Sequence, residues 1–565
     1  MTSYKQSQLS QYRFDFVVAV TQASINATMK TYLAGFKEPE MKICYVVGHD
    51  PTTSQVVPTE IEFAKLLELT EGVDPFTVNI PATNPENDPN FQKLIKAKFM
   101  TGFKVQMGIP NAADLTKLPN IVGLRADTAT VEYNLLCSEF TIAALQNEWG
   151  TYSWLQKSQD PNKPWLYSAT VDLRMAEVPS SAYSKLPKDV KDKIKNLSGS
   201  AFSIQQLLFD LSNAGLSSAA RVDGVQAGSA LETILNRYFV SKYVAKLRDE
   251  GSPMLGLAVV PYETDKSSLT LTDLNFSTNP YIDPTGGDVV LPPGEREQNL
   301  ACLNYLCAVN KNVLPPPTRF PWNWLEAGDL ADHDGVVSVN RNNMRDWLEP
   351  SLKAVAKKHC LNPTAWAQHH DGNLLKLYVK IFFGPEEQEP VIERKEEGPT
   401  VLTLSFSGAA SDDDQAGSIK LEYKYTLNVD FVGTNIVITQ NVWVWYEAHA
   451  VSASNHDVVV DDLQTDTYPI TVSNGELIVG ESKKEPIQHR AHPQDRNSFV
   501  GAFTGLNRIS DDIKDQLRGL TSIQLETIPV SAMQGFVFPG GNTFVFKNAE
   551  FSEHQDLLAF IKYTS

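Results

Sequence analysis

The clearest pattern of hydrophobic and polar positions lies between Leu421 and Phe431. Six apolar or aromatic residues alternate there with five polar ones. Side chains of a β-strand point alternately to opposite faces, so this pattern predicts a long antiparallel strand with one buried and one solvated face. Other runs predict further strands at 42–48, 104–109, 130–137, 166–173, 375–383, 401–407 and 435–451.

Four other stretches carry apolar residues at helical spacing. They predict helices at 14–33, at about 229–249, from about 342 onward, and at 498–520. The first is expected to be one long amphipathic rod, and Pro350 is expected to kink or divide the third. The fourth has the cleanest stripe, and Ser498 can cap it.

The order helix, strands, helix, strand occurs twice along the 565 residues. The sequence therefore predicts an α+β protein with an N-terminal module at 1–262, a proline-rich connecting segment at 263–335 and a C-terminal module at 336–565. The connection is expected to pack across both modules. Its Trp322 and Trp324 could stack on a sugar or lie at a lipid interface, but anchoring the connection to the core is the favoured interpretation.

Composition narrows the class of protein. The chain is 42% hydrophobic and 21% charged, which suits a globular protein, and its formal charge is −18. Such a charge repels nucleic acid and anionic membrane surfaces in general. The five cysteines lack a zinc-site spacing, the N-terminus lacks the apolar stretch of a signal peptide, and no run is long enough to span a membrane. We therefore expect a cytoplasmic, acidic protein without a cofactor or metal, and export by a non-classical route stays open.

No motif for nucleotide binding, metalloprotease or serine-hydrolase chemistry is present. Histidines 359, 369 and 370 are predicted to lie in a turn before a strand, while His449 and Glu447 are predicted to share a strand face as a hydrogen-bonded pair. Residues 411–417 are predicted to form a plain turn in preference to a calcium loop, and 384–399 a solvated hairpin tip. Pro539–Gly541 could cradle phosphate, but strand-like flanks on both sides favour a hairpin turn.

Several segments together resemble a known superfamily. They are FDFVVAVTQASINATMKTYL at the start, FSIQQLLFDLSNAG, FPWNWLE, VNRNNMRDWLEPSL and FVFPGGNTFVFKNAEFSEHQDLLAFIKY. The pattern resembles the tubular lipid-binding (TULIP) superfamily, and within it the family of the forty-seven-kilodalton accessory protein of clostridial neurotoxin gene clusters. The resemblance implies an elongated molecule of two modules, each with long helices wrapped by a curved antiparallel sheet. It also implies lipid or hydrophobe binding and a protein partner from the same gene cluster, but transfers no catalytic or ligand-contact residue.

Three functions follow as hypotheses. The first is non-enzymatic binding of a lipid or other hydrophobic ligand, and the second is a structural or adaptor subunit with a solid core. The third is a cyclase or isomerase acting on a hydrophobic small molecule, for which His369, His370 and His449 would be the first residues to mutate. A ligand groove would be lined by helix stripes and inner strand faces, at Val17, Ile25, Met29, Tyr423, Tyr425, Leu427, Phe503, Ile513 and Leu517.

Overall fold

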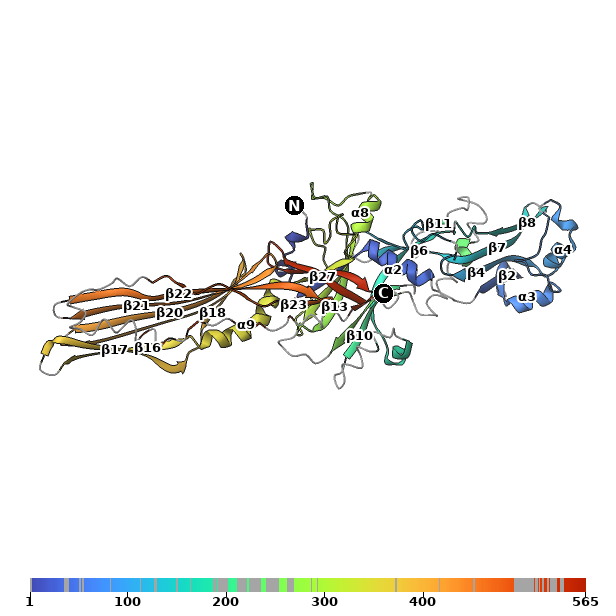
Figure 1. Cartoon of the computed structure of the whole chain (residues 1–565). Coiled ribbons are helices and arrows are strands. Elements are labelled where there is room, and N and C mark those ends of the chain that lie inside the picture. The colour runs from blue at the N-terminus through green and yellow to red at the C-terminus, as the bar shows by residue number, and fades with distance from the viewer. Residues whose placement is uncertain are drawn as a thin grey trace.

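The protein is elongated, and both ends of the chain lie near its middle (Figure 1). The computed structural model describes residues 3–34, 40–49, 52, 55–81, 83–111, 113–125, 130–148, 151–162, 164–185, 191, 202–210, 221–222, 235–239, 254–261, 269–285, 287–291, 293–370, 373–415, 417–450, 453–491, 513, 517, 519–520, 523–525, 528, 536–538 and 543–564. The described strands all pair in antiparallel fashion, and they form separate sheets along the long axis.

A six-stranded sheet in the described part of the chain occupies the middle of the molecule. Its order is β13-β14-β1-β15-β28-β27. The strands are β1 (Phe16–Thr21), β13 (Leu271–Asn279), β14 (Cys302–Val309), β15 (Gly335–Val339), β27 (Thr543–Phe551) and β28 (Leu557–Thr564). The sheet thus joins strands from all three predicted parts of the chain. The segment at 263–335 is therefore more than a connection, because it supplies β13 and β14.

The helix predicted at 14–33 is wrong for its first third. Phe16–Thr21 form β1, paired with β14 on one side and β15 on the other. All six side chains are buried, with Phe16 and Val18 in one core cluster and Val17 in another. A strand buried on both faces needs no alternation, so its β-branched run resembles a helix stripe in sequence. Helix α2 (Gln22–Ala34) follows directly, where the Thr21 hydroxyl accepts a hydrogen bond from the Ser24 amide.

At one end of the molecule lies a sheet of order β3-β2-β4-β7-β8 with helices against it (Figure 1). Its strands are β2 (Met41–His49), β3 (Val56–Ile61), β4 (Phe99–Met107), β7 (Cys137–Glu148) and β8 (Thr151–Ser158). The helices are α3 (Phe63–Leu69), η2 (Pro85–Asn87) and α4 (Pro89–Lys96). The predicted strands at 42–48 and 104–109 correspond to β2 and β4, and the strand predicted at 130–137 is divided between β6 (Thr130–Leu135) and β7.

A further sheet continues from this end toward the middle, in the order β26-β12-β10-β9-β6-β5 with β11 beside β9. Its strands are β5 (Val122–Leu124), β6 (Thr130–Leu135), β9 (Tyr167–Glu177), β10 (Phe202–Asp210), β11 (Arg221–Val222), β12 (Met254–Pro261) and β26 (Phe536–Val537). The hairpin predicted around Pro539–Gly541 is wrong in its pairing. Strand β26 pairs with β12, whereas β27 pairs with β28 in the central sheet, and residues 539–541 lie outside the described residues.

The opposite end is built by the longest strands, in the order β18-β19-β20-β21-β22-β23 with β24 and β25 beside β22 (Figure 1). They are β18 (Val391–Arg394), β19 (Thr400–Asp414), β20 (Gly417–Val432), β21 (Asn435–Ala450), β22 (Ala453–Ser473), β23 (Glu476–Val479), β24 (Lys483–Lys484) and β25 (Gln488–His489). The alternation predicted at 421–431 is confirmed, since odd-numbered residues of β20 are buried there. Sixteen residues of β20 span about 50 Å.

The hairpin of β16 (Leu361–His370) and β17 (Asn373–Glu387) lies beside this large sheet. The turn predicted around His359–His370 is therefore wrong from Leu361 onward. Helix α9 (Arg341–Lys357) precedes the hairpin and starts where the sequence predicts. Pro350 lies inside α9 without dividing it. The predicted solvated tip at 384–399 is exposed in large part, but it contains strand β18.

The remaining short helices are η1 (Tyr4–Gln6), α1 (Leu9–Tyr12), η3 (Ser180–Lys185), η4 (Leu235–Phe239) and α8 (Glu295–Leu300). The helix predicted at about 229–249 lies outside the described residues except for η4. Of the helix predicted at 498–520, only residues 513, 517, 519 and 520 are described. The Leu517 amide donates a hydrogen bond to the Ile513 carbonyl, which is the helical i to i−4 bond.

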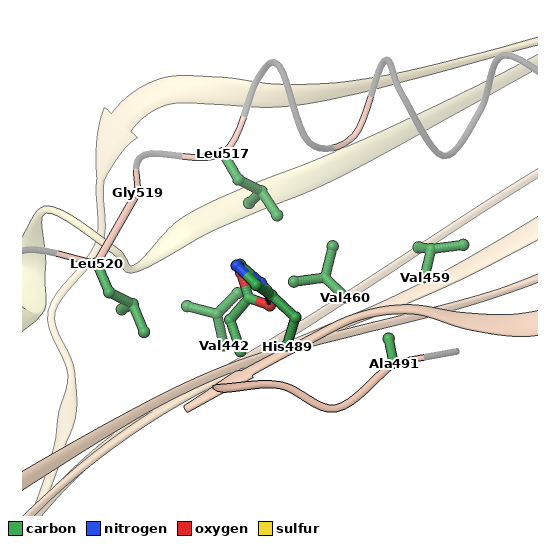
Figure 2. A pocket seen from close by; sticks show the side chains of 9 residues that line it. Val442, Val459, Val460, His489, Ala491, Leu517, Gly519 and Leu520 are labelled. Atoms are coloured by element: carbon green, nitrogen blue, oxygen red, sulfur yellow. Dashed lines mark hydrogen bonds and ion pairs between the residues drawn. The ribbon is translucent and has the colours of Figure 1, made fainter. Parts of the chain in front are cut away.

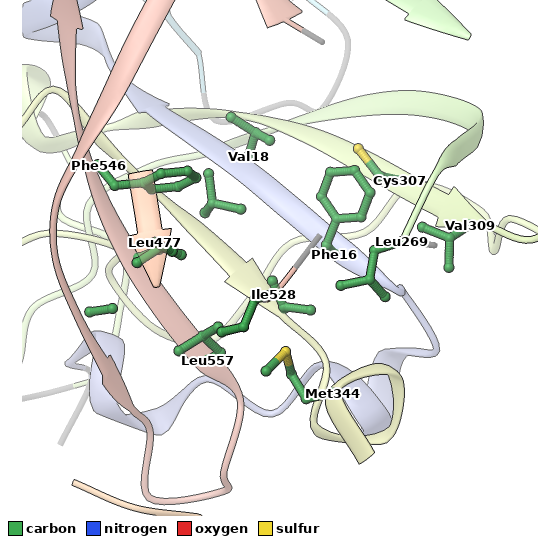
Figure 3. Close-up of a cluster of buried hydrophobic side chains, with 14 of the residues drawn as sticks. Phe16, Val18, Leu269, Cys307, Val309, Met344, Leu477, Ile528, Phe546 and Leu557 are labelled. Atoms are coloured by element: carbon green, nitrogen blue, oxygen red, sulfur yellow. The ribbon is translucent and has the colours of Figure 1, made fainter. Parts of the chain in front are cut away.

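Buried apolar side chains from distant segments meet in the middle of the molecule. Figure 3 shows Phe16 and Val18 of β1 converging with Met344 of α9, Phe546 of β27 and Leu557 of β28. On the other face of the central sheet, Phe320, Trp322 and Trp324 form a second buried cluster with Phe14 and Val17. The prediction that the two tryptophans anchor the proline-rich stretch to the core is confirmed. Their rings meet edge to face at 5.5 Å between centroids.

Candidate functional site

The large sheet carries an aliphatic hollow on its inner face, which we take as the candidate site. Its volume is about 330 Å³, and it is open on one side. Val442 of β21 and Val459 and Val460 of β22 contribute one wall. Leu517 and Leu520 point toward these valines from the opposite wall (Figure 2).

Two adjacent valines line the hollow because β22 contains a β-bulge. The pairing of β21 with β22 shifts between Val444, which faces Val460, and Trp445, which faces Val458. Val459 is the extra residue, and it is buried like its neighbour Val460. In a regular strand, consecutive side chains point to opposite faces, so only the bulge turns both toward one side. The irregularity therefore widens the aliphatic wall.

The rim of the hollow is polar. His489 of β25 lies opposite Asp462 of β22, and the His489 Nδ1 and Asp462 Oδ1 atoms are 2.7 Å apart. The next residues form a matching pair, since the Arg490 guanidinium donates to Asp461 at 2.6 Å. The His489 side chain is 71% exposed. A ligand with an apolar body and a polar end could therefore place the body among the valines and the end at His489.

The segment that carries Leu517 and Leu520, opposite the sheet, is held in place by buried side chains and a hydrogen bond on either side of the hollow. Ile513 is fully buried in the main core cluster, and Leu520 and Ile523 are buried as well. Beyond the hollow, the Tyr468 hydroxyl of β22 donates to the Ile523 carbonyl at 2.5 Å. Burial holds this hydroxyl in its protonated form by raising the pKa of Tyr468.

A second hollow lies further along β22. Its volume is about 470 Å³, and it is lined by Tyr468, Val479, Lys484, Ile523 and Leu525 among others. Glu481 and Ser482 also line it, so it is more polar than the first. Both hollows use the same strand and the same segment, 517–525, as walls.

The other predicted groove residues are found in separate places. Val17 lies on the far side of the central sheet, whereas Ile25 and Met29 of α2 lie in the main core. A hollow of about 660 Å³ next to α2 is lined by Gln22 and Leu118, not by Ile25 or Met29. Phe503 lies outside the described residues.

Tyr423, Tyr425 and Leu427 lie on the inner face of β20, but they are packed against protein. The ring of His359 stacks on Tyr425 with centroids 4.9 Å apart, and the His359 carbonyl accepts from the Tyr423 hydroxyl. The Tyr425 hydroxyl donates to Gln440 Oε1 at 2.9 Å. Burial raises the pKa of both tyrosines. Of the predicted groove residues, the first hollow therefore brings Leu517 to its wall, with Ile513 in the core behind it.

The histidines considered for catalysis take part in local pairs. His369 Nδ1 lies 2.7 Å from Asp414 Oδ2, and the His369 amide donates to the same carboxylate at 2.6 Å. Both contacts lower the pKa of Asp414. His449 Nε2 lies 3.2 Å from Glu447 Oε1, so the two side chains share one strand face as predicted. Nothing is described for the His370 side chain.

Among the described residues, no group of three or more histidine, cysteine or acidic side chains is placed to hold a metal ion. No described helix is both long and apolar enough to cross a membrane.

The sequence did not predict Val459, Val460, His489 or Asp462 as members of the site. His489 and Asp462 are 27 positions apart and meet only through the pairing of β25 with β22. The signal that could have been used is VVVDD at 458–462, where three adjacent β-branched residues interrupt the alternation of a long strand.

Comparisons with known proteins give likenesses of fold. No protein-family model matches the chain, and no curated protein matches it in sequence. A solved structure of P47 of Clostridium botulinum E1 aligns over 97% of this chain and 98% of its own length, with 8% identity and a TM-score of 0.44. P47 from Clostridium botulinum A2 aligns over 99% of each chain, with 9% identity and a TM-score of 0.42. A lipopolysaccharide binding protein covers 98% of this chain and 99% of its own, at 9% identity and a TM-score of 0.23. The elongated α+β architecture that the resemblance implies is confirmed by the structure itself.

Proposed function

We propose that the chain binds a lipid or another elongated hydrophobic molecule in the aliphatic hollow of the large sheet, without transforming it. The observation that carries the proposal is the convergence of five aliphatic side chains, three from the paired strands β21 and β22 and two from Leu517 and Leu520, on an open hollow. Its polar groups, His489 and Asp462, lie side by side at the rim, where a headgroup would meet them. Ligand sites are typically concave and apolar, with a few polar groups that fix orientation.

The size of the hollow sets the expected ligand. An apolar cavity of about 150 Å³ accommodates one benzene molecule, so about 330 Å³ accommodates roughly twice that, or about a dozen carbon atoms. Each methylene removed from water contributes about 0.8 kcal/mol, which is about a fourfold gain in affinity for each added carbon. The gain should end when the hollow is full.

The test is a binding titration of the full chain with straight-chain fatty acids of increasing length, measured by isothermal titration calorimetry. Affinity should rise with each carbon and level off near a dozen carbons. Organic extraction of the purified protein, followed by mass spectrometry, should identify the natural ligand. An empty extract together with no uptake of any fatty acid would refute the proposal.

A matched pair of variants separates the hollow from other apolar surface. Val460→Trp fills the hollow and should reduce binding of the longest chains most, whereas Val432→Trp adds the same side chain at an exposed position of β20. Equal loss of binding in both variants would argue against the hollow as the site. His489→Ala should spare the dependence on chain length while weakening acids relative to their methyl esters.

The resemblance also implies an accessory role in a toxin-related or other protein complex. That role stays a prediction, and co-purification with the products of neighbouring genes tests it.

A further inference from the structure

The β16–β17 hairpin presents an aromatic face to solvent. Pairing places Thr364 opposite Phe382, Trp366 opposite Lys380, and Gln368 opposite Tyr378. Directly paired residues share a face, and all six side chains are exposed. Trp366, Tyr378 and Phe382 are 37%, 46% and 48% exposed, although residues of this kind are normally buried.

The opposite face of the same hairpin is held against the large sheet. Ala367, Leu377 and Ile381 on that face are buried. The Ala367 amide donates to Asp412 of β19 at 2.7 Å, and the His369 amide donates to Asp414 of β19 at 2.6 Å. The hairpin is therefore fixed at two points along β16, and its aromatic face must point away from the sheet.

This face carries a positive charge, although the whole chain has a formal charge of −18. Lys380 is the one charged residue among the six, and its Nζ atom lies 5.6 Å from the centroid of the Trp366 ring. Among the described residues of the hairpin, the acidic ones are Glu386 and Glu387, at the far end of β17. Glu386 is four residues beyond Phe382, which corresponds to about 13 Å along a strand. Glu389 is neutralised by Lys353 and Lys357 of α9.

We propose that this face, formed by Trp366, Tyr378, Lys380 and Phe382, docks the protein on a lipid bilayer that contains anionic headgroups. Tryptophan and tyrosine favour the boundary between headgroups and acyl chains. A lysine beside them can lay its aliphatic stem on the apolar layer while its ammonium group reaches a phosphate. The hairpin lies at an end of the elongated molecule (Figure 1), so it can reach a bilayer ahead of the rest of the molecule.

A protein partner fits the same face less well. The three rings are each less than half exposed, so they leave on the order of 300 Å² to cover, whereas a stable protein interface takes about 800 Å² from each partner. Lysine is also depleted in such interfaces, and Lys380 stands in the middle of this face. The proposal does not depend on the proposed function, because none of these residues lines the aliphatic hollow.

The experiment is co-sedimentation of the full chain with vesicles of phosphatidylcholine, alone or mixed with phosphatidylserine. The wild type should bind the mixed vesicles more tightly. The double variant Trp366→Ala/Phe382→Ala should bind both kinds at least about tenfold more weakly, because the exposed ring area is lost. Lys380→Ala should lose about fivefold on the mixed vesicles and nothing on phosphatidylcholine alone. Val391→Ala removes a 67% exposed valine of β18 and is the matched control that should bind as the wild type does.

A second measurement uses a conservative variant that keeps an aromatic ring. Lipids brominated on the acyl chain should quench the tryptophan fluorescence of the wild type more than that of Trp366→Phe. Failure of the wild type to bind either vesicle, or unchanged binding by the double variant, would overturn the proposal. The proposal would also be overturned if analytical ultracentrifugation showed that the wild type is a dimer and the double variant a monomer. The variants of the hairpin should bind fatty acids as the wild type does. A failure of the membrane proposal can therefore be distinguished from a failure of the proposed function.

Discussion

Asp556 should make the stability of the central region depend on pH. Its carboxylate is fully buried between the N-terminal segment and α9. It accepts hydrogen bonds from the Leu9 amide at 2.6 Å, the Ser7 hydroxyl at 2.9 Å and the Arg341 amide at 3.1 Å. Burial outweighs these contacts and raises the pKa of Asp556 from 3.8 to about 6.

The sign of the effect follows from this direction. A carboxyl group whose pKa is raised by folding binds its proton more tightly in the folded state, so its stabilising contribution is complete below pH 3.8 and is lost as the pH rises through 6. A difference of about two pKa units corresponds to about 3 kcal/mol of unfolding free energy over the whole range. Between pH 5 and pH 7 the share of this one group is about 1.3 kcal/mol.

The perturbation is Asp556→Asn, which keeps the shape but stays neutral at every pH. Urea unfolding followed by tryptophan fluorescence should show that the wild type gains about 1.3 kcal/mol more than the variant when the pH is lowered from 7 to 5. Asp332→Asn, at an exposed position, should keep the wild-type pH dependence. Parallel pH profiles of the wild type and Asp556→Asn would refute the reasoning.

Two other changes have large expected effects on stability. Trp324→Ala should cost about 3–5 kcal/mol of unfolding free energy, because Trp324 is 1% exposed and contacts Phe320 and Trp322. Trp324→Phe should cost clearly less. Equal losses for the two variants in chemical unfolding would contradict the packing argument. Gly335→Ala should strongly lower the melting temperature, since a Cβ atom there would lie 2.2 Å from the Ala19 carbonyl oxygen of β1. Gly328→Ala, where the added methyl group meets nothing within 4 Å, should melt like the wild type.

Sequence patterns predicted the large sheet better than the central one. The strand at 421–431 has one wet face, and alternation reveals such strands directly. Strands β1 and β14 are buried on both faces, so their runs carry no period of two. The apolar run of β1 was therefore predicted as the first part of the helix that follows it. Strand β14 was not predicted, because the prolines and glycines around it indicated a connecting segment. Local sequence patterns also do not show which strands pair when they are nearly 300 positions apart, as Phe16 and Cys307 are.

The candidate site shows the same division. Leu517 belongs to a helical stripe visible in the sequence, and it lines the hollow. Tyr423 and Tyr425 belong to an equally clear stripe, but His359 covers Tyr425. Periodicity shows which residues face inward, but whether they meet protein or an open hollow depends on what packs opposite. The pair of valines at the bulge depends on the register between β21 and β22, which alternation alone does not reveal.

The order of strands in the central sheet has a consequence for biosynthesis. Strand β1 leaves the ribosome well before its partners β14 and β15, which begin at residues 302 and 335. Strand β15 in turn waits for β28 at 557–564. At about 5–20 residues per second, β1 waits at least about 15 s for its first partner. An apolar strand left unpaired that long is prone to aggregate, which makes β1 the segment on which a chaperone would act during translation.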